Sequence, residues 1–187
     1  MASTTSHCSS LGQLLECINF AAIKHSSQRR KDPTKTPYIN HPIGVAYILY
    51  YEGNVEDLPT LLAAVLHDTV EDTETSFEEI TAKFGSEVCE IVMACTDDKT
   101  LPSKDRKRLQ VETAPHKSDK AKLVKMADKI YNLRDLMRVL PMGWTQQRAN
   151  EYFAWAKQVT DGCRGVNAKL DAILNDIYKK QEALESI

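Results

Sequence analysis

The sequence is poor in glycine and has no glycine-rich phosphate-binding loop. Only seven of its 187 residues are glycine. They form neither the Gly-x-Gly-x-x-Gly pattern of dinucleotide-binding folds nor the Gly-x-x-x-x-Gly-Lys pattern of the P-loop. Both patterns hold phosphate groups with backbone N–H groups at the start of a helix. If this protein handles phosphates, it does so in another way.

Cysteines are also few, and no two are spaced as Cys-x-x-Cys. Their number is odd and their positions are scattered: Cys8, Cys17, Cys89, Cys95 and Cys163. Disulfide scaffolds and structural zinc–thiolate sites use cysteines in sets with short, regular spacings. The pattern argues against both and is typical of a reduced intracellular protein.

Long hydrophobic runs are missing as well. The longest uncharged apolar stretch, residues 43–51, has nine residues, which is about half the number needed to cross a bilayer. The N-terminal residues contain no apolar segment, and the first arginine is Arg29. Neither a signal peptide nor an arginine-rich transit peptide is therefore expected. We predict a cytoplasmic protein without a membrane partner.

Neither sign of charge is in large excess. The sequence has 24 Lys and Arg against 26 Asp and Glu, a formal net charge of −2 at pH 7. Proteins that bind duplex nucleic acid usually carry surplus positive charge, because they neutralise many phosphates. One basic run, residues 104–108, does not change this balance. We expect no nucleic-acid partner, although local basic clusters can still hold a small anion.

What the sequence does contain is helical periodicity. Alternation with a period of two is scarce, whereas apolar residues recur with helical spacing in residues 11–22, 61–66 and 123–140. The polar stretch before the last of these has a possible short helix over residues 103–112. The final helix is expected to begin at about Arg164.

Capping residues mark several of the expected helices. Asp57 precedes one apolar segment, and Ser76 opens a capping box for a helix that Gly85 ends. No internal repeat or low-complexity segment divides the chain. The sequence predicts an all-α fold of seven or eight helices, in one domain over residues 1–187, with residues 1–9 a frayed N-terminus.

The most informative segment is an apolar helix that runs directly into four ionisable side chains. Residues 61–66 are Leu-Leu-Ala-Ala-Val-Leu, and His67, Asp68, Glu71 and Asp72 follow. If the helix persists through Asp72, all four side chains lie within about one turn of each other. Three clustered carboxylates repel one another, and a cation would relieve that repulsion. A His-Asp pair alone is also compatible with a surface turn or a helix end.

Two distant residues give this segment its context. His41 stands at a predicted helix entrance, and Asp128 lies on an otherwise apolar face of a long helix. Each has an ordinary alternative, because His41 could cap a helix or face solvent and Asp128 could pair with an adjacent lysine on a solvated face. With His67 and Asp68 they supply two imidazoles and two carboxylates. Such a nitrogen and oxygen set suits Mn, Fe, Co or Zn.

These residues lie in three longer sequence blocks. The blocks are Arg30-Lys31 followed by Pro-Tyr-Ile-Asn-His-Pro at 37–42, His-Asp-Thr-Val-Glu-Asp-Thr at 67–73, and Lys-Met-Ala-Asp-Lys-Ile-Tyr-Asn-Leu-Arg at 125–134. Together they resemble the HD superfamily of helical metal-dependent phosphohydrolases, and within it the (p)ppGpp hydrolase domain of the bacterial RelA/SpoT family. The resemblance covers nearly the whole chain from about residue 10. The hydrolase-only length is similar to that of the metazoan SpoT homologues.

The resemblance implies roles for individual residues. The implied ligands of one Mn²⁺ ion are His41, His67, Asp68 and Asp128. The residues implied to act on the attacking water are Glu71 and Asp72. Those implied to contact a nucleotide are Arg30 and Lys31 at the base and Asn132 at the ribose.

Further substrate contacts follow from spacing and charge. Arg148 and Tyr152 are four residues apart on a predicted helix, so they could close the site with a phosphate contact and an aromatic wall. An ordinary packed or solvated helix face is the alternative. Other basic candidates for an anionic substrate are Lys24, Arg29, Lys99, Arg106, Lys107 and Arg108.

We therefore expect Mn²⁺-dependent hydrolysis of guanosine 3′,5′-bis(diphosphate), or ppGpp, to GDP and pyrophosphate. A divalent ion makes water more acidic and withdraws charge from a phosphoryl group, and a nearby carboxylate can carry the proton. An alternative substrate is NADPH, which also carries phosphate on a ribose near a purine and would lose its 2′-phosphate. A third alternative is a nucleotide-binding scaffold without turnover, against which the intact set of ionisable residues argues.

Overall fold

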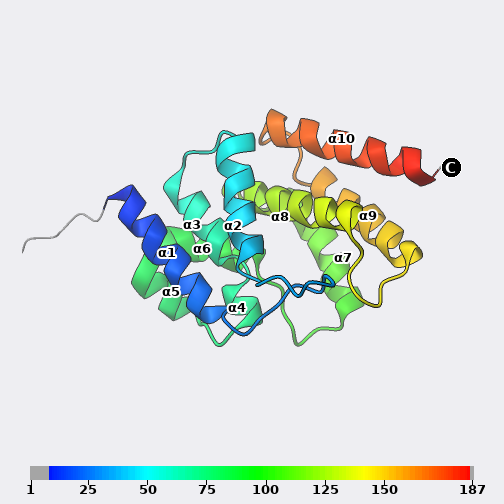
Figure 1. The fold of residues 1–187 in the computed structure, drawn as a ribbon. Helices are drawn as coiled ribbons and strands as arrows, with labels where there is room; N and C mark the ends of the chain where they lie inside the picture. Colours follow the sequence, from blue (N-terminus) through cyan, green and yellow to red (C-terminus); the bar gives the residue numbers. More distant parts are fainter. Residues whose placement is uncertain (1–8, 186–187) are drawn as a thin grey trace, which may run out of the picture.

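The computed structural model describes residues 9–185 and confirms the all-α prediction (Figure 1). These residues form ten α-helices and contain no β-strand. The helices are α1 (Ser10–Lys24), α2 (Asn40–Tyr47), α3 (Leu58–Leu66), α4 (Thr69–Asp72), α5 (Phe77–Phe84), α6 (Ser86–Cys95), α7 (Ser103–Thr113), α8 (Asp119–Arg138), α9 (Gln146–Asp161) and α10 (Ala168–Glu185). A π-helical turn, Ile48–Glu52, extends α2, and a 3₁₀ turn, Ala114–His116, follows α7.

The helix starts are set by short-range capping bonds. The side chains of Asp57 and Ser76 accept hydrogen bonds from backbone N–H groups three residues on, as predicted. Ser9 does the same for α1, and Gly85, with φ +91°, ends α5. The predicted frayed N-terminus otherwise falls on residues 1–8, which lie outside the described residues.

Helix α3 lies at the centre of the core. Residues 60–66 are all buried, because α1, α2, α6 and α8 pack around the helix. Figure 1 shows α2 passing in front of α3 and α8. Gly44 permits the close approach of α2 to α8, since a Cβ atom at this position would overlap the ring of Tyr131.

The chain does not continue as one helix from Leu66 into Asp72. Helix α3 ends at Leu66, and α4 is a separate short helix. The Nδ1 atom of His67 lies 2.8 Å from the carbonyl oxygen of Ala64, and the Thr69 hydroxyl donates to that of Leu66 at 2.7 Å. Both side chains occupy carbonyl groups of the last α3 turn, so they compete with a continued helical ladder. This break is one reason why there are more helices than predicted.

One further helix boundary differs from its prediction, and another agrees with it. Helix α10 begins at Ala168 and not near Arg164, because Gly165 has φ +88° and Asn167 accepts hydrogen bonds from the N–H groups of Lys169 and Leu170. The helix predicted at 103–112 is present as α7, and none of its residues is buried. Within residues 9–185, no helix has the length and apolarity needed to cross a membrane.

Candidate metal centre and its cleft

His41 enters the site from the first turn of α2. Its side chain is 1% exposed and packs edge-on against the rings of Tyr131 and Tyr38, with centroid distances of 4.8 and 5.7 Å. Its Nε2 atom lies 3.2 Å from Oδ1 of Asp128 and 3.5 Å from Oδ2 of Asp68. Burial therefore excludes the solvent-facing alternative for His41.

His67 and Asp68 occupy the junction between α3 and α4. Because a carbonyl oxygen can only accept, the hydrogen bond to Ala64 places the proton of neutral His67 on Nδ1. Within residues 9–185 its buried Nε2 atom has no partner with hydrogen-bond geometry, yet it faces Oδ2 of Asp68 at 3.0 Å and Oδ1 of Asp128 at 3.9 Å. In the neutral imidazole this nitrogen is an acceptor, so it repels the carboxylate oxygens unless a proton or a metal ion lies between them. The local geometry therefore fits a bound metal ion.

The electrostatics of these residues also favour a cation. Burial by itself lowers the pKa of His67, but the charges of Asp68 and Asp128 outweigh it and raise this pKa to about 9. Burial tends to raise the pKa of Asp128, whereas the charges of Lys129 and of the imidazoles hold it well below its usual range. The cluster is thus an anionic, buried site that attracts positive charge.

Helix α8 supplies Asp128 and the groups that orient it. Its Oδ2 atom is 2.9 Å from Nζ of Lys129, and its Oδ1 atom accepts a 2.6 Å hydrogen bond from Nδ2 of Asn132. One ligand atom from each of His41, His67 and Asp128 lies within 4.8 Å of the others. Three helices that are distant in sequence thus bring together a set of nitrogen and oxygen donors, which hard and borderline divalent metals prefer.

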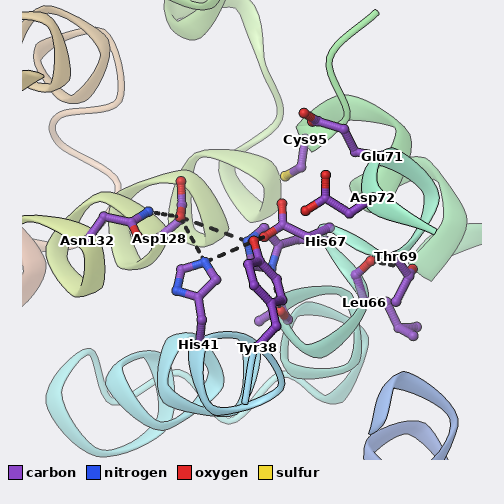
Figure 2. Close-up of polar contacts among 12 residues, drawn as sticks. Tyr38, His41, Leu66, His67, Thr69, Glu71, Asp72, Cys95, Asp128 and Asn132 are labelled. Carbon is purple, nitrogen blue, oxygen red and sulfur yellow. Dashed lines mark hydrogen bonds and ion pairs between the residues drawn. The ribbon is translucent and has the colours of Figure 1, made fainter. Parts of the chain in front are cut away.

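Glu71 and Asp72 project from α4 on the other side of His67 from His41 (Figure 2). An oxygen of Glu71 accepts the N–H of Asp97 at 3.1 Å, and its other oxygen lies 3.6 Å from Arg106. Burial, together with the charges of Asp97 and Asp68, raises the pKa of Glu71. Asp72 accepts hydrogen bonds from Lys99 at 2.5 Å and Gln28 at 2.8 Å. A carboxylate with a raised pKa is suited to exchange protons near neutrality.

The candidate metal ligands, Glu71 and Asp72 line a cleft of about 500 Å³, and so do four of the residues expected to contact a nucleotide: Arg30, Lys31, Asn132 and Tyr152. The guanidinium of Arg30 donates to Asn132 at 2.8 Å and to Asp135 at 2.9 Å, and Asn132 in turn contacts Asp128. Lys31 is exposed at the edge of the cleft, and Tyr152 forms part of its wall. Hydrogen bonds therefore connect two of the residues expected to contact a nucleotide, Arg30 and Asn132, to the candidate metal ligand Asp128.

Of the other basic candidates, Arg29 lines this cleft, whereas Lys24, Lys99, Arg106, Lys107 and Arg108 do not. Arg148 does not line it either. Its guanidinium stacks over the ring of Trp144, with its carbon 4.5 Å from the ring centroid. It faces a neighbouring hollow that is lined by residues of α7 and α9. Tyr152 and Trp144 border both hollows, so the wall between them is aromatic. The four-residue spacing of Arg148 and Tyr152 places them on the same side of α9, but it does not determine which hollow each side chain lines.

Three residues at the site escaped the sequence analysis. Tyr38 donates a 2.6 Å hydrogen bond to Asp68, although it stands within the Pro-Tyr-Ile-Asn-His-Pro block. Lys125 and Lys129 are each 5% exposed and line the cleft. Asp128 does pair with Lys129, as the ordinary alternative proposed, but not on a solvated face. The position of the two lysines on the apolar face of a core helix was the available signal, but lysines are seldom buried.

Comparison with known proteins defines the class to which this fold and site belong. Residues 17–154 match the HD domain family, so the chain belongs to that family. The chain is 61% identical over 168 residues to guanosine-3′,5′-bis(diphosphate) 3′-pyrophosphohydrolase MESH1 of Xenopus tropicalis, covering 90% of this chain and 94% of the relative. It is 57% identical over 173 residues to the Homo sapiens protein of the same name, with coverages of 92% and 97%.

A solved structure gives the same result in three dimensions. It is a metazoan ortholog of SpoT that hydrolyses ppGpp, and it superposes with a TM-score of 0.89 at 51% identity, covering 90% of this chain and 95% of that one. These relatives match this chain in fold and over nearly its full length, and each is named as a ppGpp hydrolase. The chain is accordingly an enzyme, a phosphohydrolase of the HD domain class.

Proposed function

We propose that this protein is a guanosine-3′,5′-bis(diphosphate) 3′-diphosphatase that uses one Mn²⁺ ion. The observation that carries the proposal is the buried Nε2 atom of His67, which faces the carboxylates of Asp68 and Asp128 in a cleft that also holds Glu71. The names of the full-length relatives support the choice of substrate. The wider cleft has room for a nucleotide beside this cluster.

In this proposal the metal ligands are His41, His67, Asp68 and Asp128. Their nitrogen and oxygen atoms suit Mn²⁺ as well as Fe, Co or Zn, and the resemblance to the (p)ppGpp hydrolases favours Mn²⁺. A divalent ion supplies Lewis-acid chemistry here, because it polarises a phosphoryl group and makes water more acidic. Lys129 binds the Asp128 oxygen that does not face the imidazoles, and Tyr38 donates to the Asp68 oxygen that does face them.

Glu71 and Asp72 deprotonate and orient the attacking water. Glu71, whose pKa is raised, accepts the water proton while the water oxygen bonds to the phosphorus atom next to the ribose 3′-oxygen. The bond between that phosphorus and the 3′-oxygen breaks, and the 3′-oxygen takes up one proton in place of the one that Glu71 accepted. One water is thus consumed, and GDP and pyrophosphate result. Asp72, held by Lys99 and Gln28, orients the water.

Arg30, Lys31 and Asn132 form the nucleoside end of the site in this proposal. Asp135 and Asn132 hold the guanidinium of Arg30 close to the ring of Tyr131, 5.5 Å from its centroid. A planar guanidinium in this position offers a face for a purine. Asn132 links this end to Asp128, so the ribose of a bound nucleotide would place its 3′-substituent toward the metal ligands.

The test is product release by purified protein with Mn²⁺, with ppGpp and NADPH offered separately and the Asp68→Ala variant as the blank. We expect pyrophosphate and GDP in equal amounts from ppGpp, and none from the blank. Release of phosphate from NADPH alone would keep the site and replace the substrate. Absence of turnover of both nucleotides would overturn the hydrolase proposal in favour of a nucleotide-binding protein.

A further inference from the structure

Two buried lysines flank Asp128 on α8, and their surroundings differ. Lys125 and Lys129 are both 5% exposed, and both line the cleft. Lys129 pairs with Oδ2 of Asp128 at 2.9 Å, and its ammonium also lies 4.6 Å from the centroid of the Trp155 ring. Lys125 makes no ion pair among the described residues, and its hydrogen bond goes to the carbonyl oxygen of Cys95 at 3.3 Å. One buried cation is therefore compensated and the other is not.

An uncompensated ammonium in a protein interior is costly. Burial removes water from three N–H donors, and a single long hydrogen bond to a neutral carbonyl replaces little of that solvation. A buried charge without a partner is strongly destabilising, so a counter-charge from a ligand would relieve that cost. Lys125 lines the cleft, so an anionic ligand bound there could supply this counter-charge.

The end of α6 does not account for Lys125. The C-terminal carbonyl groups of a helix attract cations, and Lys117 already donates to the carbonyl of Ala94 at 2.6 Å. Burial and the charge of Lys125 both lower the pKa of Lys117, so the two ammonium groups oppose each other at this helix end. A second cation at this helix end adds repulsion, whereas a cation that lines the cleft can bind an anionic ligand.

The position of Lys125 relates it to the reacting groups. Figure 2 shows Cys95, whose carbonyl oxygen binds Lys125, on the same side of the cluster as Glu71 and Asp72. Along α8, Lys125 precedes Asp128 by three residues, and both line the cleft. The ammonium thus belongs to the part of the cleft where the proposed mechanism places the phosphoryl group.

We propose that Lys125 is a substrate-binding residue whose ammonium contacts phosphoryl oxygens of the 3′-diphosphate, and of pyrophosphate before its release. The inference rests on the proposed function for the identity of this group, since inorganic pyrophosphate is the product that the cleavage forms. The contact adds a positive charge beside several carboxylates that would otherwise repel the substrate. Lys129 cannot replace it, because Asp128 already holds that ammonium.

The test is calorimetric binding of inorganic pyrophosphate, with Mn²⁺ in excess over pyrophosphate, to the wild type and to variants. We expect Lys125→Met to weaken binding by about tenfold or more, the usual effect of losing one charged hydrogen bond. Lys125→Gln should do the same, although it keeps a donor for the Cys95 carbonyl, while Lys125→Arg keeps most of the affinity. Both neutral variants should unfold at the same or a higher temperature than the wild type, because they remove a buried charge.

Other outcomes would overturn the inference. A neutral variant that melts at a lower temperature but binds pyrophosphate within twofold of the wild type would make Lys125 a cap of α6. A wild type that does not bind pyrophosphate would also remove the proposed contact. If Lys125→Met does not fold, Lys125→Gln decides the result. Failure of the wild type to hydrolyse ppGpp, with Lys125-dependent pyrophosphate binding intact, would instead overturn only the proposed substrate.

Discussion

The hydroxyl group of Tyr38 donates a 2.6 Å hydrogen bond to Oδ2 of Asp68. The same oxygen lies 3.0 Å from Nε2 of His67 and 3.5 Å from Nε2 of His41. Tyr38 precedes α2, whereas Asp68 follows α3, so this bond ties the loop before His41 to the α3–α4 junction (Figure 2). It fixes the carboxylate oxygen that faces both imidazoles.

Removal of this hydroxyl group should weaken metal binding. Tyr38→Phe keeps the ring that packs on His41 but frees the carboxylate of Asp68, and loss of such an outer contact typically costs about 10- to 100-fold in metal affinity or activity. Titration with Mn²⁺ measures the change. Tyr131→Phe is the matched control, since its ring also packs on His41. Equal affinities for the two variants would show that the Tyr38 hydroxyl does not position the ligand.

Loss of a ligand should remove the metal altogether. Asp68→Ala or His67→Ala deletes one donor from a buried cluster and leaves the others repelling each other, so we expect no metal to remain after gel filtration. Elemental analysis of the purified variants gives the metal content per chain. Stoichiometric retention by either variant would place the ion elsewhere.

Glu71 should separate metal binding from turnover. Glu71→Gln preserves the shape and the hydrogen bond from the N–H of Asp97 but cannot accept a proton. We expect normal Mn²⁺ content and a kcat reduced by about 10²- to 10⁴-fold, the range for loss of a general base. Full activity in this variant would show that another group takes the proton.

Gly44 should be needed for the contact between α2 and α8. A methyl group in Gly44→Ala would overlap the ring of Tyr131, which packs against His41. We expect a loss of about 1–3 kcal/mol in the free energy of unfolding, the usual cost of overpacking, and weaker Mn²⁺ binding. Urea denaturation and metal titration measure the two effects. A second change, Tyr131→Ala, should restore part of the stability if the clash is the cause.

Asp57 provides a test of stability against pH at a site away from the cleft. Burial tends to raise the pKa of Asp57, but the hydrogen bonds from Thr60 and Lys120 together outweigh it and lower this pKa overall. Its contribution is therefore present above the unfolded pKa of about 3.9 and is lost as the pH falls through the lower folded value. Asp57→Ala should cost about 1 kcal/mol at pH 7 and progressively less below pH 4.

The control for this prediction is Asp57→Asn, which retains a side-chain acceptor for the N–H of Thr60. It should lose less stability than Asp57→Ala at neutral pH. Denaturant unfolding at several pH values gives both curves. A constant difference between wild type and Asp57→Ala from pH 7 to pH 2 would mean that the carboxylate charge plays no part.

Much of this protein follows from its sequence because the signals are local. Capping residues such as Asp57 and Ser76 act on N–H groups three residues away, so they define helix starts without tertiary contacts. Apolar periodicity likewise identified the central helix α3. The spacing of His67, Asp68 and Glu71 and the blocks around His41 and Asp128 predicted a common site, and the structure places these side chains in one cleft.

Tertiary structure decided the features that depend on which faces meet. The break between α3 and α4 directs Glu71 away from His41, and it arises from side-chain bonds to carbonyl groups that no periodicity reveals. The packing of α8 against α2, α3 and α6 buries Lys125 and Lys129, whose residue type predicts exposure. Arg148 lies outside the cleft for a similar reason, because its orientation depends on the ring of Trp144. Sequence spacing determines neighbours within one helix, but burial and charge pairing depend on the approach of other helices.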